Sequence, residues 1–254
     1  MGGPRALLAA LWALEAAGTA ALRIGAFNIQ SFGDSKVSDP ACSSIIAKIL
    51  AGYDLAGSSP SPRKDEVSVV DTYLYPDPED VFSREPFVVK FSAPSSGERA
   101  PPLPCRRPAP PLPPTAQKLV LIPLHAAPHQ AVAEIDALYD VYLDVIDKWG
   151  TDDMLFLGDF NADCSYVRAQ DWAAIRLRSS EVFKWLIPDS ADTTVGNSDC
   201  AYDRIVACGA RLRRSLKPQS ATVHNFQEEF GLDQTQALAI SDHFPVEVTL
   251  KSHR

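Results

Sequence analysis

The pattern of apolar and polar positions is clearest around residues 155–163. An apolar run at 155–157 is followed by Gly158, and then by polar side chains at alternating positions, among them Asp159 and Asn161. This pattern predicts a buried strand that gives way to a turn at Gly158. Because side chains two residues apart share a face, Asp159 and Asn161 are expected to point the same way. The alternative interpretation is an Asn/Asp-rich turn that only closes a buried strand.

The same kind of pattern predicts strands and helices along the rest of the chain. Strand-like segments occur at residues 22–30, 67–74, 86–91, 118–125, 200–207 and 246–250. An apolar stripe at helical spacing predicts a helix over 131–149, a second helix is expected over 38–50, and one or two helices over 171–186. Strands and helices are intermixed, which indicates an α/β fold.

Polar residues recur where the predicted strands end. These residues are Asn28, His125, Asp159, Asn161, Asp203, Asp242 and His243. Each one has an ordinary alternative as a turn residue, a satisfied polar group or a surface ion pair. Together they indicate a site, because α/β sheets place their sites outside the carboxyl ends of strands.

The chemistry that suits these residues is metal-assisted hydrolysis of a phosphodiester. A carboxylate-bound Mg²⁺ would stabilise the charge that develops on phosphate oxygens. One histidine would activate water and the other would protonate the leaving oxygen, each oriented by a carboxylate. The chain lacks the Gly-x-Ser-x-Gly motif of many serine hydrolases and the clustered His/Cys spacing of a zinc site.

The composition says more about how this protein could bind nucleic acid than about its fold. The chain has 254 residues, of which 46% are hydrophobic and 22% charged, enough for one large domain. Its formal net charge of −8 argues against nucleic-acid binding by a broadly positive surface. A nucleic-acid substrate would therefore need bound cations and local arginines.

Residues 1–21 resemble a secretory signal peptide, with Arg5, an apolar core and small residues at the end. Glu15 is unusual there, and an amphipathic helix is the alternative. No later stretch is apolar for long enough to span a membrane. We therefore expect a secreted protein or one in the secretory pathway, with retention in the cell if it misfolds.

The five cysteines agree with an oxidising compartment. Cys164 and Cys200 are the favoured pair, since each adjoins a motif, whereas Cys42 and Cys208 are predicted to be buried thiols. Cys105 lies in the proline-rich segment 93–115, which is expected to be a surface loop. This loop is interpreted as a spacer, with a ligand for aromatic grooves as the alternative.

Six motifs resemble, in order, those of the deoxyribonuclease I family within the endonuclease/exonuclease/phosphatase fold. They are Ala-Phe-Asn-Ile at 26–29, Phe-Ser-Arg-Glu-Pro at 82–86, Leu-His-Ala-Ala-Pro at 124–128, Gly-Asp-Phe-Asn-Ala-Asp-Cys-Ser-Tyr at 158–166, Cys-Ala-Tyr-Asp-Arg-Ile at 200–205 and Ile-Ser-Asp-His-Phe-Pro at 240–245. The resemblance runs over residues 22–254. It implies a sandwich of two mixed β-sheets with helices on the outer faces.

The resemblance also implies roles for individual residues. Asn28, Asp159 and Asp242 would surround the divalent metal and the scissile phosphate. His125 and His243 would be the acid/base pair, with Asp203 orienting His243. Phosphate contacts would come from Asn161, Tyr166 and Arg84. Cys164 and Cys200 would form the family's disulfide, with Mg²⁺ as the catalytic cation and Ca²⁺ as the structural one.

One part of the family pattern is missing after Ala56. There the family continues through a strand, a helix and a second strand, and these carry two glutamates. One glutamate is a metal ligand and the other orients the histidine that matches His125. Here the residues at 57–65 join the flanks directly. Because native stability is only ~5–15 kcal/mol, loss of two core strands is expected to impair both folding and activity.

The sequence thus predicts a monomeric, secreted, metal-dependent endonuclease that leaves 5′-phosphate ends on DNA and is impaired in this form. One alternative is a phosphatase or sphingomyelinase of the same fold. Another is an inactive form that acts as a binding protein. Actin is a conceivable partner for such a form, although nothing in the sequence supports it.

Overall fold

The computed structural model describes residues 21–31, 33, 36, 38–51, 68–93 and 117–251. Three features considered above lie outside the described residues. These are the signal-like segment up to residue 20, the junction at 57–65, and the proline-rich loop from 94 onward with Cys105.

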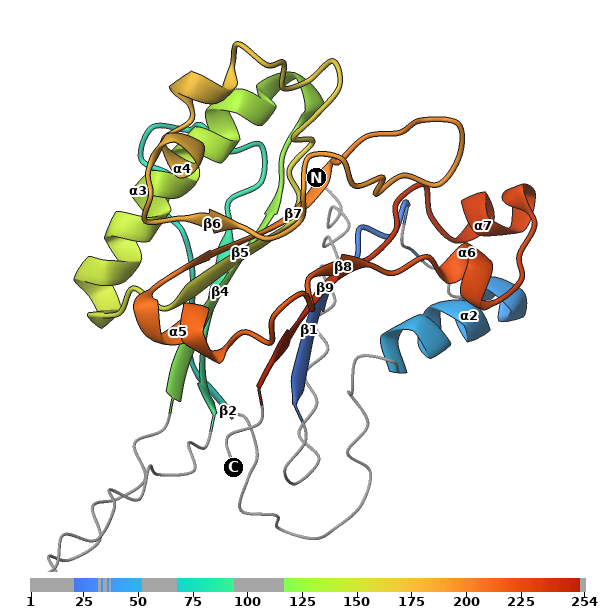
Figure 1. Cartoon of the computed structure of the whole chain (residues 1–254), viewed down its shortest axis with the longest axis horizontal. Coiled ribbons are helices and arrows are strands. Elements are labelled where there is room, and N and C mark those ends of the chain that lie inside the picture. Colours follow the sequence, from blue (N-terminus) through green and yellow to red (C-terminus); the bar gives the residue numbers. More distant parts are fainter. Residues whose placement is uncertain are drawn as a thin grey trace, which may run out of the picture.

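Two β-sheets form the centre of the fold (Figure 1). The larger sheet has the order β2-β3-β4-β5-β7-β6, and its β4–β5 pair is parallel whereas its other pairs are antiparallel. Its strands are β2 (Ser68–Leu74), β3 (Phe87–Ala93), β4 (Gln117–His125), β5 (Met154–Asp159), β6 (Lys184–Trp185) and β7 (Asp203–Cys208). The smaller sheet is antiparallel, with the order β1-β9-β8, and consists of β1 (Leu22–Ala26), β8 (Thr222–Val223) and β9 (Val246–Leu250).

The central strands of the larger sheet are buried on both faces. Along β5, Leu155 and Leu157 pack with Ile24 and Val248 of the smaller sheet. Phe156, between them in sequence, belongs to the cluster on the opposite face, under the long helix α3. This alternation is the period-two pattern of a strand whose two faces are both covered.

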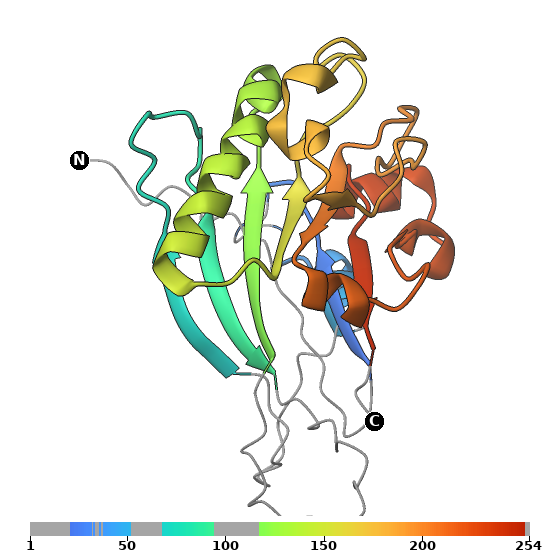
Figure 2. The same ribbon diagram turned by 60° about the vertical axis from the view of Figure 1, so that its left-hand side comes forward.

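Helices cover the outer faces of the sandwich (Figures 1 and 2). On the larger sheet lie α3 (Ala131–Trp149) and α4 (Arg176–Ser179), with the 3₁₀ turns η1 (Pro128–Gln130) and η2 (Trp172–Ala174) beside them. On the side of the smaller sheet lie α2 (Pro40–Ala51), α6 (Phe226–Glu229) and α7 (Gln234–Ile240). A short helix, α5 (Ala210–Ser215), follows β7.

The α/β sandwich predicted from the sequence is confirmed, and the predicted helix over 131–149 has the observed bounds of α3. The helix predicted over 171–186 is wrong for most of that range. The chain there forms η2, the four-residue α4 and the short strand β6. Ser179 and Ser180 end α4, as expected of side chains that compete for backbone hydrogen bonds.

The two sheets are unequal in size, with six strands in one and three in the other among the described residues. Within the described part of the chain, β1 is an edge strand that pairs only with β9. The loss of core strands after Ala56 stays a prediction, because residues 52–67 lie outside the described part of the chain.

The cysteine predictions agree with the structure. Cys164 and Cys200 form a disulfide, and Cys42 and Cys208 are free and buried. Among the described residues, no helix is long and apolar enough to cross a membrane.

Candidate active site

Strand register brings three polar side chains together at one edge of the larger sheet. His125 at the end of β4 pairs in register with Asp159 at the end of β5. On its other side, Asp159 pairs with Asp203 at the start of β7. The site is therefore fixed by backbone hydrogen bonding in the middle of the sheet, a rigid support for functional groups.

Gly158 allows this close packing, and its role differs from the expected one. The residue lies within β5 instead of ending it, opposite Leu124 of β4. Its φ is +133°, and a Cβ placed on it would lie 2.2 Å from the Leu124 carbonyl oxygen. The glycine is thus required by the close approach of two strands immediately before His125 and Asp159.

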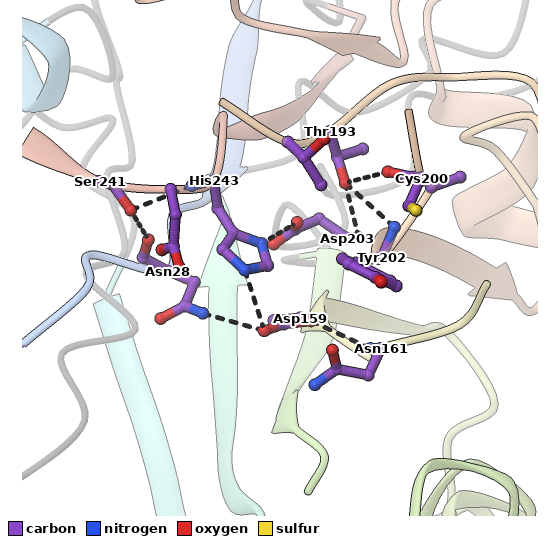
Figure 3. Close-up of polar contacts among 12 residues, drawn as sticks. Asn28, Asp159, Asn161, Thr193, Cys200, Tyr202, Asp203, Ser241 and His243 are labelled. Atoms are coloured by element: carbon purple, nitrogen blue, oxygen red, sulfur yellow. Dashed lines mark hydrogen bonds and ion pairs between the residues drawn. The ribbon is translucent and has the colours of Figure 1, made fainter. Parts of the chain in front are cut away.

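The smaller sheet supplies the other half of the site. Asn28 follows β1, and His243 precedes β9. The amide Nδ2 of Asn28 donates to Asp159 Oδ2 at 2.9 Å, and His243 Nε2 lies 3.7 Å from the same oxygen (Figure 3). His243 Nδ1 donates to Asp203 Oδ2 at 2.6 Å. The site therefore spans both sheets, and Asp159 is at its centre.

The two histidines have opposite charge preferences. Burial, with the positive charges of Arg84 and His243, lowers the pKa of His125 to about 4. Burial also disfavours the charged form of His243, but Asp203 and Asp159 outweigh it and raise the pKa of His243 to about 10. At neutral pH one imidazole is neutral and the other is charged, as an acid/base pair requires.

His125 has one unsatisfied nitrogen. Its Nε2 lies 3.7 Å from Asp159 Oδ2. Its Nδ1 is buried and has no hydrogen-bond partner among the described residues. Catalytic imidazoles are normally held through the nitrogen that does not react. His243 has such a partner in Asp203, whereas the described part of the chain provides none for His125.

The other predicted residues lie around this centre. Asn161 is buried, and its Nδ2 donates to the Ala126 carbonyl at 2.9 Å. Asp242 accepts a hydrogen bond from Gln30 Nε2 at 3.0 Å and contributes to the electrostatics of both histidines. Arg84 is exposed and close enough to His125 to lower its pKa. Tyr166 is more distant. Its ring centroid lies 5.4 Å from that of Tyr202, and the Tyr202 centroid lies 6.1 Å from that of His243.

Two supporting hydroxyls were not singled out from the sequence. Thr193 Oγ1 accepts from the amides of Tyr202 and Asp203 at 3.0 and 3.1 Å. Ser241 Oγ donates to the Asn28 carbonyl at 2.6 Å and accepts from the His243 amide at 3.2 Å. Ser241 could have been suspected from the Ser-Asp-His motif. Thr193 carries no such signal, because its role depends on a loop position that only the fold defines.

The donor set suits a hard divalent cation. Asp159 is buried beside Asp203, and this burial and repulsion raise its pKa, so a nearby cation would relieve the cost of ionising it. Asp159, Asp203 and His243 have possible ligand atoms within 4.8 Å of one another. However, Asp203 and His243 are bound to each other. Asp159 and Asn28, with Asp242 nearby, are therefore the better ligands, and Mg²⁺ commonly uses only one or two carboxylates.

Comparison with known proteins decides the family. Residues 25–243 match the endonuclease/exonuclease/phosphatase family. This chain belongs to that family. Within it the chain is a member of the deoxyribonuclease I group, since it is 80% identical to Deoxyribonuclease-1-like 2 of Homo sapiens, with all of both chains covered. It is also 46% identical to Deoxyribonuclease-1 of Gallus gallus, with 97% of each chain covered.

Solved structures agree with this family fold. A humanized TDP2 of D. rerio has a TM-score of 0.54 at 15% identity, covering 90% of this chain and 98% of that one. The alignment with the human relative extends over 299 positions, whereas this chain has 254 residues. Some positions of the human relative therefore have no counterpart in this endonuclease/exonuclease/phosphatase family member, as expected if a segment is missing.

Proposed function

We propose that this site hydrolyses DNA phosphodiester bonds endonucleolytically with the help of a divalent metal, and that this chain does so at a strongly reduced rate. The observation that carries the proposal is the convergence of His125 and His243 on Asp159, each at 3.7 Å from the same carboxylate oxygen. The names of the relatives, which are deoxyribonucleases, support DNA as the substrate.

The charge states of the histidines assign their roles in this proposal. Neutral His125 accepts a proton from the attacking water, and charged His243 donates one to the 3′ oxygen as its bond to phosphorus breaks. The phosphate then stays on the 5′ oxygen, so the nick has a 5′-phosphate end and a 3′-hydroxyl end. Asp203 keeps the His243 imidazole oriented and charged through the 2.6 Å hydrogen bond.

The remaining predicted residues bind the substrate and the cation. Asp159, Asn28 and Asp242 would hold Mg²⁺, which when bound stabilises the charge on the phosphate oxygens. Arg84, Asn161 and Tyr166 contact phosphates. Local contacts of this kind are needed because the net charge of −8 gives no general attraction for DNA. Ca²⁺ has a structural role elsewhere in the fold.

Two features support the reduced rate. The buried Nδ1 of His125 has no partner among the described residues, so nothing there fixes the ring or its tautomer. The alignment with the human relative extends over 299 positions, against 254 residues here, which supports loss of the strands that carry the family's two additional glutamates. Removal of one metal ligand and one orienting carboxylate would weaken both cation binding and proton transfer.

We further propose that the chain is secreted after removal of residues 1–21 and acts as a monomer. The Cys164–Cys200 disulfide supports an oxidising compartment. The test is expression in cells that secrete proteins. A protein that stays out of the culture medium and keeps residues 1–21 would contradict this part of the proposal.

Plasmid nicking in Mg²⁺ and Ca²⁺ tests the proposed activity. We expect slow conversion of supercoiled to nicked plasmid, loss of that conversion in EDTA, and a further decrease in His125→Ala. Nicking as fast as that of the human relative would contradict the impairment. An equal rate in His125→Ala would contradict the histidine mechanism, and phosphate release without nicking would indicate a phosphatase.

A further inference from the structure

Glu134 is a buried charged residue with no part in the site described so far. It lies in the first turn of α3 and is completely buried. Its Oε1 accepts hydrogen bonds from the backbone amides of Ser83 and Ala127, each at 3.2 Å. Its Oε2 has no partner among the described residues. A buried carboxylate with one unsatisfied oxygen is costly, so it requires an explanation.

The two amides that Glu134 binds belong to two different loops of the site. Ser83 immediately precedes Arg84 in the loop between β2 and β3. Ala127 lies two residues after His125, in the loop that leaves β4. A second contact joins the first loop to the same end of α3, because Ser83 Oγ donates to Gln130 Oε1 at 3.5 Å.

We propose that Glu134 is a positioning residue that fixes Arg84 relative to His125 by holding both loops on one carboxylate oxygen. Arg84 directly follows Ser83 and is exposed, and His125 lies two residues before Ala127. The position of Arg84 relative to His125 therefore depends on a link between these two loops. Glu134 supplies that link, since its side chain bonds both loops and its own helix is packed into the core.

This inference rests on the proposed function, because Arg84 is taken to contact a DNA phosphate. DNA binding is measured in EDTA, so that no cleavage occurs, by fluorescence anisotropy of a short labelled duplex at several salt concentrations. Arg84→Ala should weaken binding. It should also reduce the slope of the logarithm of the binding constant against the logarithm of the salt concentration (the salt slope) by about 0.9, the contribution of one phosphate contact. No change in Arg84→Ala would refute the phosphate contact, and with it this part of the proposed function.

Glu134→Ala should reproduce the binding defect of Arg84→Ala, and the double variant should be no weaker than either single one. Glu134→Gln should restore binding, because an amide oxygen can accept the same two hydrogen bonds. If Arg84→Ala weakens binding but Glu134→Ala does not, Glu134 has no positioning role, and the proposed function is unaffected.

A matched control separates positioning from general destabilisation. Val145→Ala shortens a fully buried side chain in the same helix, about three turns further along. It should lower the Tm without changing the salt slope. Hydrogen exchange should become faster at the amides of Ser83 and Ala127 in Glu134→Ala and stay unchanged there in Val145→Ala. Equal exchange in both variants would overturn the inference.

If Glu134→Ala does not fold, Ser83→Pro provides the test. This variant removes the amide of the Arg84 loop that donates to Glu134, together with the Ser83 Oγ contact to Gln130, and leaves the carboxylate and its bond to Ala127 intact. It should lower the salt slope as Arg84→Ala does. An unchanged slope would overturn the inference.

Discussion

Replacement of Arg204 should destabilise the fold more than any other single change outside the apolar core. Its side chain is fully buried next to Asp203, and its guanidinium donates to the carbonyl oxygens of Ala201, Ile187 and Ala162 at 2.6, 3.1 and 3.1 Å. It also pairs with Asp189 at 2.7 Å. Three segments that surround the site are thus held by one cation.

The magnitude follows from the groups left without a donor. Arg204→Met leaves three carbonyl oxygens unsatisfied, at ~1–3 kcal/mol for each buried group. Asp189 is half exposed, so its lost partner adds little. Three such oxygens together give an expected loss of about 3–9 kcal/mol, which is comparable to the ~5–15 kcal/mol that stabilises a domain.

Arg178 provides the matched control. Like Arg204 it pairs with Asp189 at 2.7 Å and lies over the rings of Trp172 and Trp185, but its side chain is one-third exposed. Arg178→Met should therefore cost at most about 1 kcal/mol. Urea unfolding of both variants measures the difference. Equal losses would refute the reasoning, since Arg204 is buried and donates to three buried carbonyl oxygens, whereas Arg178 is partly exposed and its hydrogen bond goes to Asp189.

Three further predictions concern charge and metal. Asp203→Asn should lower the pKa of His243, measured by NMR titration of the metal-free protein, and decrease residual nicking by at least ~10²-fold. The pKa of Asp136 lies below its ordinary 3.8 because hydrogen bonds from Arg176 outweigh the effect of burial. This pair therefore stabilises the fold above about pH 4 and stops doing so as the pH falls through the lowered pKa. The stability difference between the protein and Arg176→Gln should thus shrink as acid is added. A cation at 100 times its Kd should add about 2.7 kcal/mol to the free energy of unfolding, and this gain should disappear in Asp159→Asn.

Local sequence patterns were enough to predict the parts of the fold in which one face is consistently apolar. The stripe of α3 and the apolar run of β5 could be recognised because the apolar residues that form them are buried from one end of each element to the other. Residues 171–186 could not be predicted in this way. Their conformation depends on Trp172 and Trp185 packing around Arg204, which is distant in sequence.

The site residues could be named from the sequence because they fall at strand ends, but their geometry could not. The register that puts Asp159 between His125 and Asp203 depends on pairing across three strands. Glu134 looks like an ordinary surface residue of an amphipathic helix. Only the fold places it under two loops.

Restoring the missing segment tests the central claim most directly. If the human relative carries residues opposite the proposed gap after Ala56, they would be inserted there, and plasmid nicking would be compared before and after. We predict an increase of at least about 100-fold, because His125, the proposed general base, would gain a partner for its Nδ1. An unchanged rate in a folded protein would contradict the claim that this chain is a nuclease limited by an incomplete site.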